Sequence, residues 1–242
     1  MVNKAKFQRY IRKSHRYLGL ILGIQFLFWT LGGLYFSWTN IDEIRGDSLR
    51  RKEDNIDPKQ LKASLADVLA GIQADSVVKV STVSILGQAH YQLFISTDSQ
   101  RRILLADAQS GSIREPLSES EAVLVAKESL RSPSTVVKTE RITSTNGHHE
   151  YREKPLPAYA ITFDQPASTT VYVSAELGSV QSFRNNQWRI FDFLWMLHVM
   201  DFESRDNINN WLLRAFSVFG LITLLSGFTL YFVTSRKIMI TK

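Results

Sequence analysis

Two long apolar stretches near the ends of the chain dominate its hydrophobic pattern. Between Arg16 and Asp42 no residue is charged, and "YLGLILGIQFLFWTLGGLYFSWTNI" holds about 22 strongly apolar positions, or roughly 33 Å of α-helix. Residues 211–233, "WLLRAFSVFGLITLLSGFTLYFV", form a second stretch, in which Arg214 is close enough to the start to reach lipid headgroups. The pattern therefore predicts membrane-spanning helices over residues 17–38 and 211–233.

A secretory signal peptide is the alternative explanation of the first stretch, because basic residues precede it. The apolar core of such a peptide is usually about 7 to 15 residues long and is followed by a small-x-small cleavage site. The stretch here is longer and closes on "LYFSWTN". We therefore expect it to remain in the mature protein as an anchor.

Basic residues gather beside both predicted spans. Residues 1–16 and 234–242 hold nine Lys and Arg side chains and no acid, whereas the rest of the chain holds 20 basic and 23 acidic residues. Cytoplasmic flanks of membrane helices carry such an excess of basic side chains. We therefore expect both termini in the cytoplasm and residues 39–210 on the far side of the membrane. No nucleic-acid partner is expected, because the basic residues cluster at membrane ends.

The middle of the chain begins with a predicted linker over residues 39–57, which includes the charged and aperiodic "DEIRGDSLRRKEDNID". Residues 58–116 then combine a helix with strands. Asp57 and Pro58 suit a helix start, and apolar residues recur at helical spacing in "LKASLADVLAGI". Three stretches rich in β-branched and aromatic residues follow: "VVKVSTVSIL", "AHYQLFIST" and "RRILLADAQSGSIR".

The same order reappears in residues 117–186. Ser118 and Glu121 form a capping-box signature, and "TVVKTERITS", "PAYAITFD" and "TTVYVSAELGSVQSF" supply three further strands. The closing hairpins "ILLADAQSGSI" and "VYVSAELGSV" align around Gly111 and Gly178, which can adopt positive φ. We therefore predict an α+β domain of two helix-plus-three-strand antiparallel repeats between two transmembrane α-helices.

Each repeat resembles the PepSY domain, whose third strand typically carries a D/S-A-x-x-G turn, and the whole chain resembles the PepSY-associated transmembrane family. The resemblance is carried by the duplicated turn, by "SHRYLGLILG" in the first span and by "LLSGFTLYF" in the second. In that family the first span often begins H-x-x-x-G, matched by His15 and Gly19, and a further histidine precedes a later span, matched by His198. The resemblance implies that both histidines are candidate axial ligands of a b-type haem. Members that look like ferric-siderophore reductases have more spans and bind haem between them.

His15 and His198 cannot bind one haem within one chain. Two axial imidazole nitrogens on one iron lie about 4 Å apart, whereas about 30 Å of hydrocarbon separates the inner end of the first span from the outer face. A homodimer or a partner subunit would have to pair each histidine with one from another chain. The alternatives are that His15 belongs to the basic cytoplasmic collar and that His198 fills an interfacial helix.

That interfacial helix is predicted over residues 187–203, which contain "RIFDFLWMLHVMDF". The segment is hydrophobic but too short to cross a bilayer, and one helical face carries Phe191, Leu194, Trp195, His198 and Phe202. Other histidines are interpreted as structural. The "GHHE" segment offers one carboxylate beside two diverging imidazoles and is predicted to be a solvated loop, and His90 alternates with strand residues. No metal site is expected.

Small residues in the predicted spans indicate close helix packing. Gly19 and Gly23 form G-x-x-x-G in the first span, and Gly220, Thr223 and Gly227 form a stripe at helical spacing in the second. Packing of the two spans against each other explains both features. A dimer or partner contact is the further alternative.

The motifs that are missing exclude several function classes. The chain has no Cys, which removes disulfides, iron–sulfur clusters and covalent haem attachment. It also lacks the phosphate loop, the dinucleotide fingerprint and the zinc-protease and serine-hydrolase motifs. We therefore expect no catalytic residues and a non-enzymatic accessory or interaction subunit, whose sheet edges bind a partner by strand addition. The resemblance implies a protein of the bacterial inner membrane with its main domain in the periplasm, and it links the protein to iron or siderophore uptake.

Two alternative functions stay open. One is a haem-binding membrane electron carrier that assists ferric-siderophore reduction, which the two histidines suggest. The other is a module that restrains a periplasmic peptidase, because PepSY modules elsewhere resemble protease propeptides.

Overall fold

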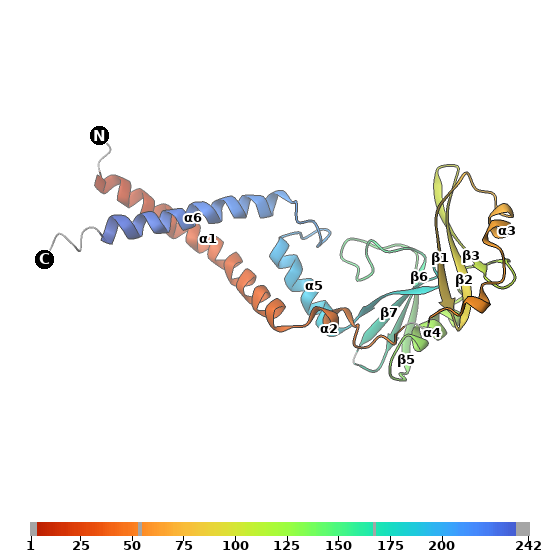
Figure 1. Ribbon diagram of the computed structural model, residues 1–242. Helices are drawn as coiled ribbons and strands as arrows, with labels where there is room; N and C mark the ends of the chain where they lie inside the picture. The colour runs from red at the N-terminus through yellow and green to blue at the C-terminus, as the bar shows by residue number, and fades with distance from the viewer. Residues whose placement is uncertain (1–3, 53–54, 167, 236–242) are drawn as a thin grey trace. The chain divides into compact units, whose positions relative to one another are not determined.

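The computed structural model describes residues 4–52, 55–166 and 168–235 (Figure 1). The chain forms two compact units. Met1–Thr39 and Ile190–Lys242 make the first, here called the helical unit, and Asn40–Arg189 make the second, here called the sheet unit. Residues 236–242, most of the predicted cytoplasmic tail over residues 234–242, lie outside the described residues.

The helical unit contains two helices that are long and apolar enough to cross a membrane. They are α1 (Lys4–Trp38) and α6 (Trp211–Ser235). In the most apolar 18-residue stretch of each helix, only 17% (α1) and 6% (α6) is buried. The two helices are therefore not core helices of a water-soluble fold. This exposure supports the two predicted spans. Helix α1 also extends through the basic residues that precede the predicted span, because Lys, Arg and Gln favour helix.

A third long helix, α5 (Asn186–Val199), begins in the sheet unit and continues into the helical unit. It contains the hydrophobic segment that is too short to cross a bilayer. Residues 200–210 connect α5 to α6 and are mostly polar.

The sheet unit contains two four-stranded antiparallel sheets (Figure 1). The first is ordered β1 (Ser76–Ile85), β2 (Gln88–Thr97), β3 (Gln100–Asp107), β4 (Ile113–Arg114); the second β5 (Val136–Ile142), β6 (Ala158–Phe163), β7 (Thr169–Ser174), β8 (Ser179–Arg184). The sequence predicted three strands in each. The difference arises because each predicted closing hairpin was counted as one strand and contributes two, joined by a turn in which Gly111 and Gly178 adopt φ of +78° and +65°.

Four shorter helices complete the sheet unit: α2 (Ile41–Arg45), the 3-10 helix η1 (Pro58–Gln60), α3 (Leu65–Ala70) and α4 (Glu119–Glu128). The helix expected to start at Pro58 is interrupted, because the backbone N–H groups of Lys62 and Ala63 both donate to Ala108 O at 2.9 Å. The chain thus crosses the turn after β3 before α3 begins. Helix α4 starts with the predicted capping box, in which Ser118 and Glu121 each bond to the other's backbone.

Two of the three apolar clusters of the sheet unit pack helices onto the sheets. The larger one places α4 on the second sheet and also includes Ile85 and Leu105 of the first sheet. Its α4 side consists of the residues predicted from helical spacing: Ala122, Val125, Ala126 and Leu130, which follows the helix. The smaller cluster packs Val68 of α3 against Ala89, Tyr91, Leu93 and Ile95 of β2.

We predict that Gly46→Ala destabilises the sheet unit more than Gly87→Ala. The two glycines have nearly equal φ, +80° and +79°, so Ala costs about 1–2 kcal/mol at each. A Cβ at Gly46 would also lie 2.7 Å from the Cβ of the buried Phe183, which adds about 1–3 kcal/mol. Gly87 has no such neighbour within 4 Å. Pulse proteolysis of the full-length protein in detergent and graded urea measures both losses. Equal losses would contradict the packing argument.

Candidate functional site

His15 lies where α1 packs against α6. Its Nδ1 is 2.8 Å from Ser226 Oγ and 3.2 Å from Thr223 O. The Ser226 hydroxyl donates to Thr223 O at 2.7 Å, so its oxygen is left to accept from the imidazole. This arrangement favours the tautomer in which Nδ1 carries the proton and Nε2 keeps its lone pair. A metal-binding histidine is commonly oriented in the same way.

The C-terminal end of α5 packs against α1 in the helical unit. The last carbonyl groups of a helix have no partner inside the helix, and each costs several kcal/mol if left unpaired in lipid. Side chains from outside α5 satisfy three of them: Gln25 Nε2 donates to Leu197 O (2.7 Å), Trp29 Nε1 to His198 O (2.8 Å) and Asn210 Nδ2 to Val199 O (2.8 Å). The end of α5 is therefore fixed by α1 and by the connection to α6.

The ring of His198 lies among aromatic side chains. Its centroid is 5.8 Å from that of Trp29, 6.0 Å from that of Phe36 and 6.1 Å from that of Trp195, whose ring is nearly parallel. The Nδ1 atom is buried and has no hydrogen-bond partner among the described residues. An unpaired buried polar atom costs about 1–3 kcal/mol. This nitrogen is therefore a candidate atom for binding a ligand.

The structure keeps the two candidate haem ligands apart. His15 contacts α6, whereas His198 lies beside Trp29 and Phe36 of α1. From residue 15 to residue 29 the axis of α1 rises by about 21 Å, at about 1.5 Å per residue. This exceeds the spacing of two axial nitrogens on one iron, which is about 4 Å. The two histidines of one chain therefore cannot bind the same iron.

The four glycines singled out for helix packing lie in two environments. A Cβ at Gly220 would lie 3.4 Å from the ring of Phe26, and one at Gly227 would lie 3.2 Å from His15 Cε1. Positions Gly19 and Gly23 have nothing within 4 Å. The close approach of α1 to α6 therefore occurs at the glycines of α6.

Asp201 organises the connection between α5 and α6. Burial raises the pKa of its carboxyl, but hydrogen bonds outweigh burial and lower the pKa to about 2. The donors are Ser204 Oγ and the backbone N–H groups of Glu203, Ser204 and Asn207. Asp192 of α5 also pairs with Arg205 of this connection at 2.5 Å. The Asp201 carboxylate therefore acts as the structural centre of a polar turn.

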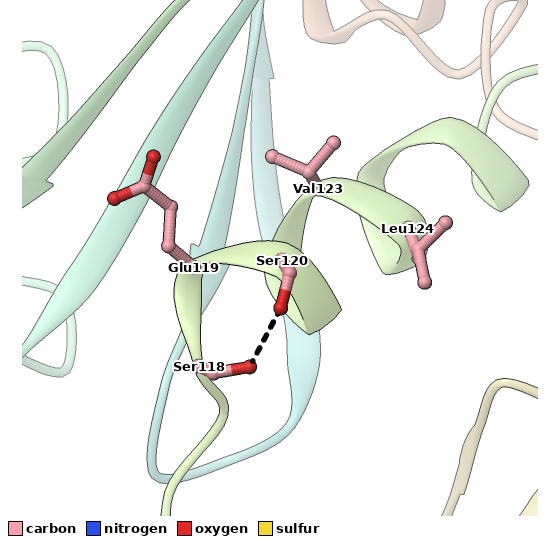
Figure 2. Close-up of a pocket in the computed structure, with 5 residues that line it drawn as sticks. All are labelled: Ser118, Glu119, Ser120, Val123 and Leu124. Carbon is pink, nitrogen blue, oxygen red and sulfur yellow. Dashed lines mark hydrogen bonds between the residues drawn. The ribbon is translucent and has the colours of Figure 1, made fainter.

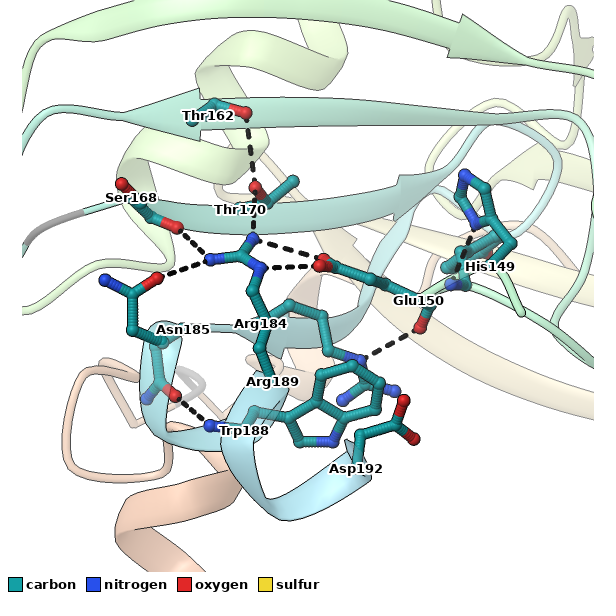
Figure 3. A network of polar contacts seen from close by, with 12 residues as sticks. His149, Glu150, Thr162, Ser168, Thr170, Arg184, Asn185, Trp188, Arg189 and Asp192 are labelled. Carbon is teal, nitrogen blue, oxygen red and sulfur yellow. Dashed lines mark hydrogen bonds and ion pairs between the residues drawn. The ribbon is translucent and has the colours of Figure 1, made fainter. Parts of the chain in front are cut away.

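In the sheet unit, Glu150 holds the start of α5 (Figure 3). Its Oε1 is 2.5 Å from Arg189 Nε and its Oε2 is 3.2 Å from Arg189 Nη2, a two-point ion pair that fixes orientation. Arg189 also donates to Ser168 O, and Arg184 donates to the backbone carbonyl of Glu150. The "GHHE" segment, predicted to be a solvated loop, thus supplies the anchor for this helix.

A cavity of about 370 Å³ lies beside β1 in the sheet unit. Its apolar lining includes Val83, Leu86 and Val180, and residues 50–52 also line it. Strand β1 is at the edge of its sheet: it pairs with β2, and no described strand pairs with its other side. Exposed Thr82 and Ser84 of β1 line the cavity. Free backbone groups and space for side chains therefore occur together here.

A second pocket lies on α4, and Figure 2 shows the side chains that line it. It is lined by Ser118, Glu119, Ser120, Val123 and Leu124, and the two serine hydroxyls lie 3.2 Å apart. These residues form the first turns of the helix and its capping box. The pocket therefore belongs to the helix start.

Residues 12–241 match a known family, the PepSY-associated TM region. The chain belongs to this family. The match confirms the resemblance stated from the duplicated turn and the two spans, and it extends over both units. No curated protein and no solved structure matches the chain.

Family membership together with α1 and α6 makes this PepSY-associated chain a membrane protein. Among its described residues, no three His, Asp or Glu side chains are grouped to hold a metal ion. His15 and His198 stay predicted haem ligands, and the four glycines stay predicted packing positions.

We predict that Gly227→Ala lowers the stability of this PepSY-associated protein and that Gly23→Ala raises it. A methyl group at Gly227 would push the His15 ring from Ser226 and separate the helices, which costs about 1–3 kcal/mol. At Gly23 there is open space, and Ala favours helix over Gly by about 0.5–1 kcal/mol. Thermal unfolding of the full-length protein in detergent measures both. A Gly227→Ala protein as stable as wild type would contradict the predicted fit.

Proposed function

We propose that this protein is a non-enzymatic accessory subunit of the bacterial inner membrane. In this proposal α1 and α6 anchor it, both termini are cytoplasmic, and the sheet unit lies in the periplasm as a duplicated PepSY-like module. The sheet unit binds an extended segment of a partner protein. The free side of β1 beside the 370 Å³ cavity is the observation that carries the proposal.

Strand β1 suits the addition of another strand. It is ten residues long and rich in Val, and its unpaired side presents backbone donors and acceptors in a row. Strand addition obtains affinity from main-chain hydrogen bonds and specificity from pockets that take alternate side chains. The cavity at Thr82 and Ser84 supplies such a pocket.

Iron or siderophore uptake is the setting that the family resemblance suggests for this subunit. Its partner would then be a membrane or periplasmic component of the uptake system. The basic flanks of both spans support the proposed orientation, because cytoplasmic flanks are enriched in Lys and Arg.

Photo-crosslinking in cells tests the partner site. We expect a photoreactive amino acid at Thr82 and one at Ser84 to crosslink to the same partner protein, in cells grown with little or with ample iron. Mass spectrometry identifies the partner in the adduct. Gln109, exposed on the β3–β4 turn, is the matched control position and should give little of this adduct. Absence of any adduct at residues 82 and 84, or equal labelling at residue 109, would contradict the proposal.

A second candidate function is that of a haem-binding membrane electron carrier that assists ferric-siderophore reduction. Two observations favour it: the hydrogen bond that leaves His15 Nε2 with its lone pair, and the unpaired, buried Nδ1 of His198. A bound haem would supply one-electron transfer at its iron. Either histidine would hold the haem together with a copy of the same histidine from a second chain.

An absorption spectrum of the full-length protein, produced with ample haem, tests this candidate. If a haem is bound, we expect a Soret band and sharp bands on reduction. His15→Ala or His198→Ala should remove them, whereas His149→Ala should not, because His149 lies in the sheet unit and its Nδ1 accepts a hydrogen bond from the backbone N–H of Tyr151. A colourless wild-type protein, or bands that persist in both ligand variants, would reject haem binding.

A further inference from the structure

The first turns of α1 are basic on one side only. At 3.6 residues per turn, five cationic side chains fall within about 120° of the helix circumference. They are Lys6, Arg9, Arg12, Lys13 and Arg16, all exposed, and are here called the basic stripe. Lys4 falls outside this sector. The helix therefore gathers these five cations on one side.

The basic stripe points away from α6. The opposite side of α1 makes the contacts with α6, since His15 bonds to Ser226 and Leu22 is only 2% exposed. Ile11, on the same side as Leu22, is half-buried. The five cations therefore face the surroundings of the protein.

An apolar stripe continues on the side of α1 that carries the cations. Its residues are highly exposed: Leu20 (69%), Ile24 (60%), Leu27 (57%) and Leu31 (48%). Helical spacing places them in line with Arg9, Lys13 and Arg16. Along one side of the helix a charged zone is thus followed by an apolar zone, which is the order of headgroup and acyl chain in a phospholipid.

The protein does not neutralise the basic stripe with acids from its two spans. The first acidic residue of the sequence is Asp42, and no acidic residue follows Asp206. Like charges three or four residues apart on a helix repel each other, as Arg9, Arg12, Lys13 and Arg16 do. An external anion would relieve this repulsion.

We propose that the basic stripe binds the headgroups of anionic phospholipids, with an acyl chain lying along Leu20, Ile24, Leu27 and Leu31. Guanidinium groups can bind phosphate oxygens at two points. The basic stripe ends at Arg16, one helical turn before the apolar zone starts at Leu20. Each cation near an anionic membrane surface strengthens binding by about fivefold. This site is independent of the strand-addition site on β1 and of haem.

Native mass spectrometry of the full-length protein with phosphatidylglycerol or phosphatidylcholine tests the proposal. Wild type should retain phosphatidylglycerol preferentially. The variant Arg9→Gln, Arg12→Gln, Lys13→Gln, Arg16→Gln should retain it at least tenfold less. A control with four charges removed from exposed positions of the sheet unit, Lys59→Gln, Lys62→Gln, Lys127→Gln, Arg141→Gln, should behave as wild type.

A charge-conserving variant separates lipid binding from misfolding. Arg9→Lys, Arg12→Lys, Arg16→Lys should keep most of the preference for phosphatidylglycerol. Equal retention of the two lipids by wild type, or the same loss in the sheet-unit control, would overturn the proposal. So would an acidic protein that occupies the stripe and excludes the lipid.

Discussion

A polar backbone group within a bilayer must find its hydrogen-bond partner inside the protein. This constraint organises the helical unit. Helix α5 ends beside α1, and the donors that make this ending possible are the side chains of Gln25, Trp29 and Asn210. Gln25 is only 9% exposed. Burying its amide in an otherwise apolar span would cost free energy if the amide did not donate to the end of α5. His15 follows the same rule further along α1, where Ser226 and Thr223 supply its partners.

Sequence patterns were sufficient to predict those elements that depend on neighbouring residues. The two spans follow from uncharged apolar stretches, the start of α4 follows from the capping box of Ser118 and Glu121, and the hairpin turns follow from Gly111 and Gly178. In each case residues of one continuous segment determine the structure. The family was recognisable because these local features occur in a fixed order along the chain.

The remaining features depend on residues that are distant in the sequence. Glu150 and Arg189 are 39 positions apart, and no motif connects the two charges. The predicted helix at Pro58 is interrupted by the carbonyl of Ala108, which belongs to a turn almost fifty residues later. Likewise, the unpaired nitrogen of His198 becomes evident only when the surrounding rings from α1 and α5 are in place. Such features follow from tertiary packing, and one sequence does not reveal them.

The pairing of β1 with β2 shifts register between Val77 and Lys79. A bulge of this kind bends the strand and raises its local twist. In the proposed strand addition, the regular part of β1 that an incoming chain would pair with is Lys79–Ile85, a stretch of about seven residues. The same irregularity, with the charge of Lys79 beside it, discourages copies of the protein from stacking edge to edge into an open-ended sheet.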